Sequence, residues 1–452
     1  MPIGPFMFRM IEEEARGLQT RLDRIKPFAL LEPMVPAANL FPNAQSAIER
    51  ALIDGRRELR RLMASFLAWL QRARTAATPA DAQRRLSILR LRFHAVLNEF
   101  DMFSEVITQR SEHDNGPWLS GLDAVAADAL TLDGEFYELP PVVCHLERGP
   151  GAAIRRARTR LPGGRTNPVA VIRVPRERMV GSGIASSLIH EVGHQAAALI
   201  GLVPSLRAML KPLKEEAGAD SDLWAIWDRW ISEIVADFFS VARVGITSTI
   251  GLIGVVSLPR AFVFRIDVND PHPTPWLRVK ISTAIGQALY PHPQWARLAA
   301  LWEALYPREG LDLERRALFE RLERHLPQFV ARLVEHRPAK LGGRSLSEVL
   351  AVHTRAPRRL ALLFENWSQA PAGMYRARPT LAFAVLGQAR ADGKLSPEDE
   401  SVLVGKLLTF WALKTTLDTG YICAVAGATT LRDARAAAAI QPSKPSLAIQ
   451  GG

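Results

Sequence analysis

The sequence is poor in cysteine. Its two cysteines, Cys144 and Cys423, lie far apart, and neither has a second cysteine at the short spacing that zinc-binding cysteine motifs use. We therefore expect neither a disulfide framework nor a cysteine-based zinc site, and the low cysteine content fits a reducing compartment.

Long apolar runs are also missing. The first residues, MPIGPFMFRMIEEEARG, carry acidic side chains where a secretory signal would have its apolar core. The most apolar stretch, residues 244–259, is short for a bilayer span, contains glycines and hydroxyl side chains, and is bounded by Arg243 and Arg260. We expect a cytoplasmic protein in which residues 244–259 form a buried helix; a membrane-inserting segment is the less favoured alternative.

Lysine is scarce, since only nine of the 57 basic residues are lysines, and the 46 acidic residues leave a formal net charge of +11. An arginine excess can favour anionic partners such as nucleic acid or anionic lipid. However, the arginines alternate with acidic residues, and no nucleic-acid-binding motif is present. We interpret the charge, including the strip formed by Arg56, Arg57, Arg60 and Arg61, as a solvated surface first and an interaction site second.

Residues 184–194, IASSLIHEVGH, contain the pattern HExxH. Positions i and i+4 of an α-helix share one face, so His190 and His194 can point both imidazoles at one metal ion. Glu191 lies beside them, where a carboxylate can take a proton from a water that the metal activates. The pattern arises by chance in roughly one chain in a hundred of this length. The prediction therefore needs a third ligand, because catalytic zinc usually takes three.

Residues 221–243, SDLWAIWDRWISEIVADFFSVAR, have apolar side chains at helical spacing and predict a strong helix. Glu233 and Asp237 interrupt the apolar run, and their i, i+4 spacing places them on one face. A charge within a buried helix is costly unless it is paired or binds a metal. We interpret Glu233 as the third ligand and Asp237 as the group that holds a ligand histidine by its other ring nitrogen. The alternative is two solvated carboxylates on an exposed strip.

HEVGH followed by EIVAD resembles the gluzincin metallopeptidases, in which a downstream ExxxD helix supplies the glutamate ligand. The long separation of the two motifs is nearer to the CAAX-prenyl endopeptidase and heat-shock membrane protease group than to the thermolysin-like enzymes. DPHPTPWLRV, residues 270–279, resembles that group's HP…R segment. The resemblance covers about residues 165–285 and implies that His272 and Arg278 contact substrate or the developing oxyanion. For His272, the alternative is a turn histidine between prolines.

One departure from this group concerns the membrane. Its members carry a pair of transmembrane helices, and the sequence offers no convincing pair. Membrane-embedded activity is therefore not part of the expectation.

The fold class that these patterns predict is mainly α (α+β): a zincin-like metallopeptidase core with a small sheet beside the HExxH helix, flanked by helical regions. Residues 1–110 form the helical N-terminal region, with helices at about 44–75 and 79–110. Residues 111–340 form the metallopeptidase domain, and residues 341–436 a small helical domain that follows the glycine pair of LGGRS. Residues 437–452 are expected to be a disordered tail.

Within the central domain, Val169–Val174 predicts a strand next to the HExxH helix, where zincin peptidases lay an extended substrate. Residues 148–165 predict a basic loop or short helix. Residues 195–220 turn from apolar to polar and are expected to form a movable lid.

In the C-terminal region, ADGKLSPEDESVL weakly resembles a corner of tellurite-resistance TerB-like domains. It also resembles half of an EF-hand loop, but Gln388 and Arg390 fall where carboxylate ligands belong, so calcium binding is not expected. Ser396 is interpreted as a helix N-cap, with Asp399 completing a capping box.

The function that these observations predict is a zinc-dependent endopeptidase with one zinc ion per chain. His190, His194 and Glu233 are the expected ligands, Glu191 the general base, and a peptide or protein the substrate. The alternatives are a scaffold protein that keeps the zincin fold and its zinc and binds partner proteins through its helical flanks, and a peptidase delivered to another cell as an effector. Membrane association remains possible on this basis but is not favoured.

Overall fold

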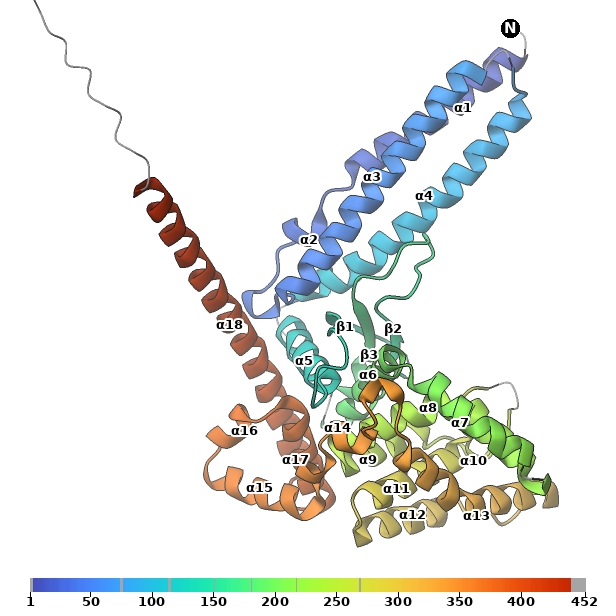
Figure 1. The fold of residues 1–452 in the computed structure, drawn as a ribbon, viewed down its shortest axis with the longest axis vertical. Helices are drawn as coiled ribbons and strands as arrows, with labels where there is room; N and C mark the ends of the chain where they lie inside the picture. The colour runs from blue at the N-terminus through green and yellow to red at the C-terminus, as the bar shows by residue number, and fades with distance from the viewer. Residues whose placement is uncertain are drawn as a thin grey trace, which may run out of the picture.

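The computed structural model describes residues 3–73, 76–112, 115–149, 151–179, 181–216, 218–267 and 270–439. These residues form a mainly helical protein with one small three-stranded sheet, which confirms the predicted mainly α class with a small sheet; the zincin-like core stays a prediction. Figure 1 shows a body that carries two extensions, an N-terminal helical arm and the far half of the last long helix, α18 (Pro397–Ala439).

The arm consists of three long helices, α1 (Ile3–Arg24), α3 (Pro42–Ala73) and α4 (Pro79–Thr108), with the short α2 (Phe28–Leu31) beside them. The helices predicted at 44–75 and 79–110 correspond to α3 and α4. Their apolar side chains recur at helical spacing and bury one face of each helix in a shared core, including Ile48, Leu59 and Phe93. A capping box of Thr78 and Asp81 starts α4.

The sheet has the strand order β1 (Val142–Glu147), β3 (Ala170–Pro175), β2 (Ala153–Arg155). β1 pairs with β3 in parallel, with Cys144 opposite Ile172, and β2 pairs with β3 antiparallel, with Ile154 opposite Ile172. Val143 and Val171 belong to the core of the arm, whereas Cys144 and Ile172 belong to the core of the body. The sheet therefore separates two apolar cores, because alternate side chains of a strand point to opposite faces.

Two predictions about this region need correction. The strand predicted at Val169–Val174 is β3, but it is the central strand, so both of its edges are already paired. The segment 148–165, expected to be a loop or short helix, contains β2, one of the two edge strands. Three residues are too few to show a β periodicity, so the pairing partner rather than the local sequence decides this conformation.

The body is built around α6 (Gly183–Ile200) and α8 (Ser221–Val244), which pack directly on each other. Gly193 makes this approach possible, since a Cβ atom there would lie only 2.9 Å from Ala236 Cα. The predicted apolar helix is α9 (Ile246–Val256), which packs on α6 and α8. The remaining helices of the body are α5 (Asn115–Leu130), α7 (Leu202–Glu216), α10 (Arg260–Val263), α11 (Pro275–Leu289), α12 (Pro293–Leu305) and α13 (Leu313–Glu335).

The bridge between the two ligand helices, residues 195–220, differs from the expected movable lid. Residues 202–216 form α7, whose apolar side chains Leu206 and Leu210 are buried and which packs along α8. No single helix within the described ranges is both long and apolar enough to cross a bilayer; α6 and α7 meet that criterion only together, as a pair bent by 76°.

The C-terminal helices are α14 (Leu346–Val349), α15 (Pro357–Gln369), α16 (Ala372–Arg376), α17 (Pro379–Ala391) and α18. Ser396 is the predicted N-cap, because its Oγ accepts a hydrogen bond from Asp399 N (3.0 Å). Buried side chains of α17 and α18, such as Leu386 and Leu408, lie in the same core as those of α6 and α8. The separate domain 341–436 stays a prediction. Of the expected tail 437–452, residues 440–452 lie outside the described residues, and residues 437–439 end α18.

Short 3₁₀ helices connect several elements: η1 (Pro36–Ala38), η2 (Gln109–Ser111), η3 (Arg176–Arg178), η4 (Gly218–Asp220), η5 (Ala339–Leu341) and η6 (Val352–Arg355).

Candidate metal centre

The packing of α6 on α8 brings together the two motifs found in the sequence. His190 and His194 lie one turn apart on α6, and their rings are 4.8 Å apart between centroids. Glu233 of α8 faces both of them: its Oε2 lies 3.2 Å from His190 Nε2, and its Oε1 lies 3.3 Å from His194 Nε2. One ligand atom from each residue falls within 4.8 Å of the others, so the three residues could hold a metal ion.

The environment of Glu233 fits a metal ion. Its Oε2 is buried and, among the described residues, makes no hydrogen bond, although a buried carboxylate oxygen normally has a partner. Burial would raise the pKa of this carboxyl group, but the nearby His190 and His194 outweigh burial and hold the pKa well below its usual range. Glu233 is therefore an ionised ligand within reach of two imidazole nitrogens, a donor set that suits zinc and other transition metals.

Asp237 occupies the position predicted from its spacing, one turn beyond Glu233. Its Oδ1 lies 2.7 Å from His190 Nδ1. A hydrogen bond from Nδ1 leaves the lone pair of Nε2 directed at the candidate metal position. Burial alone would lower the pKa of His190, but Asp237 and Glu233 outweigh it and raise that pKa to about 9. A metal ion that binds at Nε2 would therefore displace a proton from His190.

Arg278 of α11 reaches the same cluster from a third helix. Its Nε donates to Asp237 Oδ2 (2.7 Å) and its Nη2 donates to Asp237 Oδ1 (2.9 Å). Burial would raise the pKa of Asp237, but Arg278 and His190 lower it to about 2. The guanidinium is thus engaged with Asp237, and the expected contact of Arg278 with substrate or oxyanion stays a prediction.

His272 lies at the rim of the site, with about half of its side chain exposed. Its Nε2 is 3.4 Å from Glu233 Oε2, and its Nδ1 is 2.7 Å from Asp270 Oδ1. Asp270 also accepts a hydrogen bond from the backbone N–H of His272 (2.9 Å), so it orients both the turn and the ring. Asp270 was not predicted as a site residue from the sequence; its position two residues before a candidate histidine is the signal that could have indicated it.

A cavity of about 160 Å³ opens at these residues. Glu191 lines it, with only 8% of the residue exposed. Gly151 and Ala152, which lead into β2, form another part of the wall, and Leu252 and Val255 of α9 a third. Of the seven residues predicted from the sequence, all but His194 line this cavity, together with the two residues that precede a strand not predicted from the sequence.

The segment that follows β2 is anchored at two points. Ala157 N donates to Oε1 of the buried Gln195 on α6 (2.8 Å). Farther on, Gly163 N donates to Glu99 Oε1 on α4 (2.8 Å), and Arg165 forms an ion pair with the same carboxylate. These contacts hold β2 between the metal helix and the arm.

Comparison with family models, with curated proteins and with solved structures finds no match to the chain.

Proposed function

We propose that this protein is a zinc-dependent peptidase of the gluzincin type. The observation that carries the proposal is the convergence of His190, His194 and Glu233 from two helices on one point, next to the cavity that Glu191 lines. Two imidazoles and one carboxylate are a donor set found in catalytic zinc sites that keep a fourth position open. The same donors also serve non-haem iron, and Glu191 favours the hydrolytic alternative because it supplies a base.

When bound, zinc would polarise the scissile carbonyl and lower the pKa of a bound water toward neutrality. The chain itself supplies the proton acceptor. Glu191 follows His190 directly and faces the cavity, where its carboxylate can accept a proton and return it to the leaving amine. Asp237 and Arg278 act as positioning residues, since Asp237 holds the ring of His190 and Arg278 is engaged with Asp237; both also line the cavity. His272 is the candidate group for the oxyanion.

The sheet offers a place for an extended peptide. β2 pairs with β3 along one edge, and among the described residues its other edge has no strand partner. The residues before β2 line the cavity, so a peptide that paired with this edge would pass the metal site. We therefore propose that an extended substrate pairs with β2, and not with β3, the strand expected from the sequence.

The decisive experiment compares Glu191→Gln with the parent protein. Zinc content is measured by elemental analysis, and cleavage of a peptide library is measured with and without a chelator. We expect Glu191→Gln to retain about one zinc per chain and its helical circular dichroism, and to lose roughly 10²- to 10⁴-fold in turnover, the usual contribution of a general base. Glu177→Gln, at an exposed position outside the cavity, is the matched control and should retain activity.

The scaffold alternative predicts another pattern. If Glu191→Gln supports the cellular role of the protein in full while His190→Ala does not, the metal is structural and the peptidase proposal is wrong. Parent protein that holds iron rather than zinc would also contradict it.

A further inference from the structure

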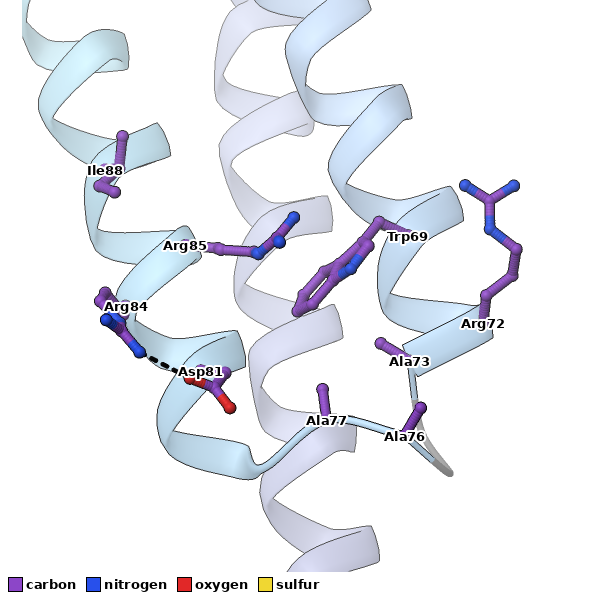
Figure 2. Close-up of a pocket in the computed structure, with 9 residues that line it drawn as sticks. All are labelled: Trp69, Arg72, Ala73, Ala76, Ala77, Asp81, Arg84, Arg85 and Ile88. Atoms are coloured by element: carbon purple, nitrogen blue, oxygen red, sulfur yellow. Dashed lines mark hydrogen bonds and ion pairs between the residues drawn. The ribbon is translucent and has the colours of Figure 1, made fainter.

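The arm carries a groove that has no part in the metal centre. Two adjoining cavities of about 640 and 490 Å³ lie between α3 and α4, and both are lined by Trp69, Arg85 and Ile88. Figure 2 shows the first of them near the turn that joins the two helices, with a third helix behind. That turn is at the distal end of the arm, away from the body (Figure 1).

The groove has an apolar lining. Leu62, Phe66 and Leu89 contribute to the wall beside Trp69, and Ile88 stands at the opening with 62% of the residue exposed. The arm has three long helices, so the α3–α4 face is the place where a fourth helix would complete a bundle. An exposed apolar surface of this kind on a helix pair marks a contact site.

The charged residues around the groove are predominantly arginines, and two of them lack a carboxylate partner. Arg84 pairs with Asp81 (2.6 Å), and Arg92 pairs with Glu58 (2.5 Å). In the part of the chain that the structure describes, Arg72 forms no ion pair, and the guanidinium of Arg85 contacts only the ring of Trp69, 4.1 Å from its centroid.

Figure 2 shows Arg72 and Arg85 on opposite sides of Trp69. The apolar wall is thus flanked by two cations that are available to carboxylates of a ligand.

We propose that this groove binds an acidic amphipathic helix of a partner protein. The apolar face of such a helix would pack on Trp69 and Ile88, and its flanking carboxylates would pair with Arg72 and Arg85. The lining residues of α3 run from Glu58 to Ala73, about 22 Å along the helix, which matches roughly four turns of a ligand helix. Nucleic acid is less suitable, because its regularly spaced phosphates leave the apolar wall uncovered.

This docking site goes beyond the proposed peptidase function and does not depend on it. Because the arm extends away from the body, a partner held at its end leaves the cavity of the metal centre open (Figure 1). The groove is therefore suited to recruit a partner protein while the metal centre remains accessible.

The test uses the full chain and two fluorescein-labelled peptides of roughly 16 residues, four turns of helix. Both have leucines at i, i+3, i+4 and i+7, one with glutamates on the flanks and the other with lysines at the same positions. We expect fluorescence anisotropy to show that the glutamate peptide binds at least about tenfold more tightly than the lysine peptide, and more weakly at high salt. The double variant Arg72→Glu/Arg85→Glu should lose roughly tenfold or more in affinity for the glutamate peptide.

Two further variants separate the groove from general charge effects. Ile88→Ser should also weaken binding of the glutamate peptide. Because Ile88 is exposed, this substitution should not disturb the fold, so a loss of binding would not be due to misfolding. Arg21→Glu, at an exposed position of α1, is the matched control and should bind as the parent protein does. Circular dichroism verifies the fold of each variant.

Several results would overturn the proposal. One is that the glutamate peptide does not bind to the parent protein. Another is that the parent protein and the double variant bind the glutamate peptide with equal affinity. A third case is that the glutamate peptide does not bind, whereas duplex DNA or vesicles of phosphatidylserine and phosphatidylcholine bind and require Arg72 and Arg85. This result would assign the groove to those ligands instead. A loss of self-association in the double variant, measured by sedimentation equilibrium, would assign it to a second copy of the chain.

Discussion

Asp237 shares its two carboxylate oxygens between a histidine and an arginine. Oδ1 faces His190 Nδ1 and Oδ2 accepts from Arg278, and Asp237 itself is buried. A carboxylate that holds a ligand histidine affects a metal site as strongly as many ligands do, although it does not touch the ion.

We therefore predict that Asp237→Asn weakens zinc binding by roughly 10- to 100-fold. The amide keeps the size of the side chain, but it removes the charge that pairs with Arg278 and orients His190. Competition with a chromogenic chelator measures the affinity. Asp270→Asn, at the exposed end of the cluster, is the control and should bind zinc nearly as the parent protein does. Equal affinity of Asp237→Asn and the parent would remove Asp237 from the site.

At the scale of the elements, the contact of α6 with α8 decides whether the two motifs meet. Gly193 lies at the centre of this contact, and a Cβ there would lie 2.9 Å from Ala236 Cα and 3.0 Å from Phe239 Cβ. Backbone atoms of a packed helix cannot move aside as a flexible side chain can, so a methyl group must separate the helices.

Gly193→Ala is accordingly expected to destabilise the protein by about 1–3 kcal/mol, despite the better helix propensity of alanine. It should also weaken zinc binding, because α8 carries Glu233. Gly17 of α1 has no atom within 4 Å of the position of a Cβ, so Gly17→Ala is the control and should be neutral or stabilising. Thermal unfolding and zinc titration test both variants. A Gly193→Ala protein with unchanged stability would show that the helices can separate at no cost.

We predict that the contact of α13 with α8 is weakened at low pH by protonation of His325. This histidine is buried, and its Nδ1 accepts a hydrogen bond from Trp227 Nε1 (2.9 Å). Burial lowers the pKa of His325 below its usual value of 6.5, since an imidazolium would lose its hydration. The folded protein thus binds this proton less readily than the unfolded chain, so the stabilisation is complete above pH 6.5 and is lost as the pH falls toward the folded pKa.

Thermal unfolding is measured at two pH values: neutral pH, and a pH about one unit below the pKa of a histidine in the unfolded chain. His325→Gln, which cannot bind the proton, should lose less stability over this interval than the parent protein. His94→Gln, at an exposed position of α4, is the matched control. The same pH dependence in the parent and in His325→Gln would assign the loss of stability to other groups.

At the scale of the whole molecule, the question is whether residues 341–436 fold independently of the rest of the chain. Gly342 and Gly343 are exposed and have positive φ angles of 61° and 78°, conformations that favour glycine and mark an accessible turn. On either side of this turn the buried side chains lie in one core. α18 also crosses α5 so closely that a Cβ at Gly121 would lie 2.4 Å from Leu408 O.

Limited proteolysis should therefore cut at the glycine pair, and the two fragments should remain together on size exclusion, because separation would expose their shared core. Fragments that separate and keep helical circular dichroism would instead support the independent domain that the sequence predicts.

The local parts of this protein follow from its sequence. The spacing of His190 and His194, and of Glu233 and Asp237, places each pair on one helical face whatever the surroundings, because helix periodicity is a property of the chain itself. The same reasoning predicts α3, α4, α8 and α9, whose apolar side chains repeat over many residues. The sequence also identifies β3, but not its place within the sheet.

The tertiary structure decides what depends on partners distant in the chain. Only the packing of helices shows that Arg278 is engaged by Asp237, that Gly193 admits the backbone of α8, and that Trp69 lies in an open groove. It also decides that residues 153–155 form β2, an edge strand, because three residues adopt an extended conformation only when a neighbouring strand provides the hydrogen bonds. These features arise from contacts between elements, and the periodicity of one segment carries no information about which other segment will cover it.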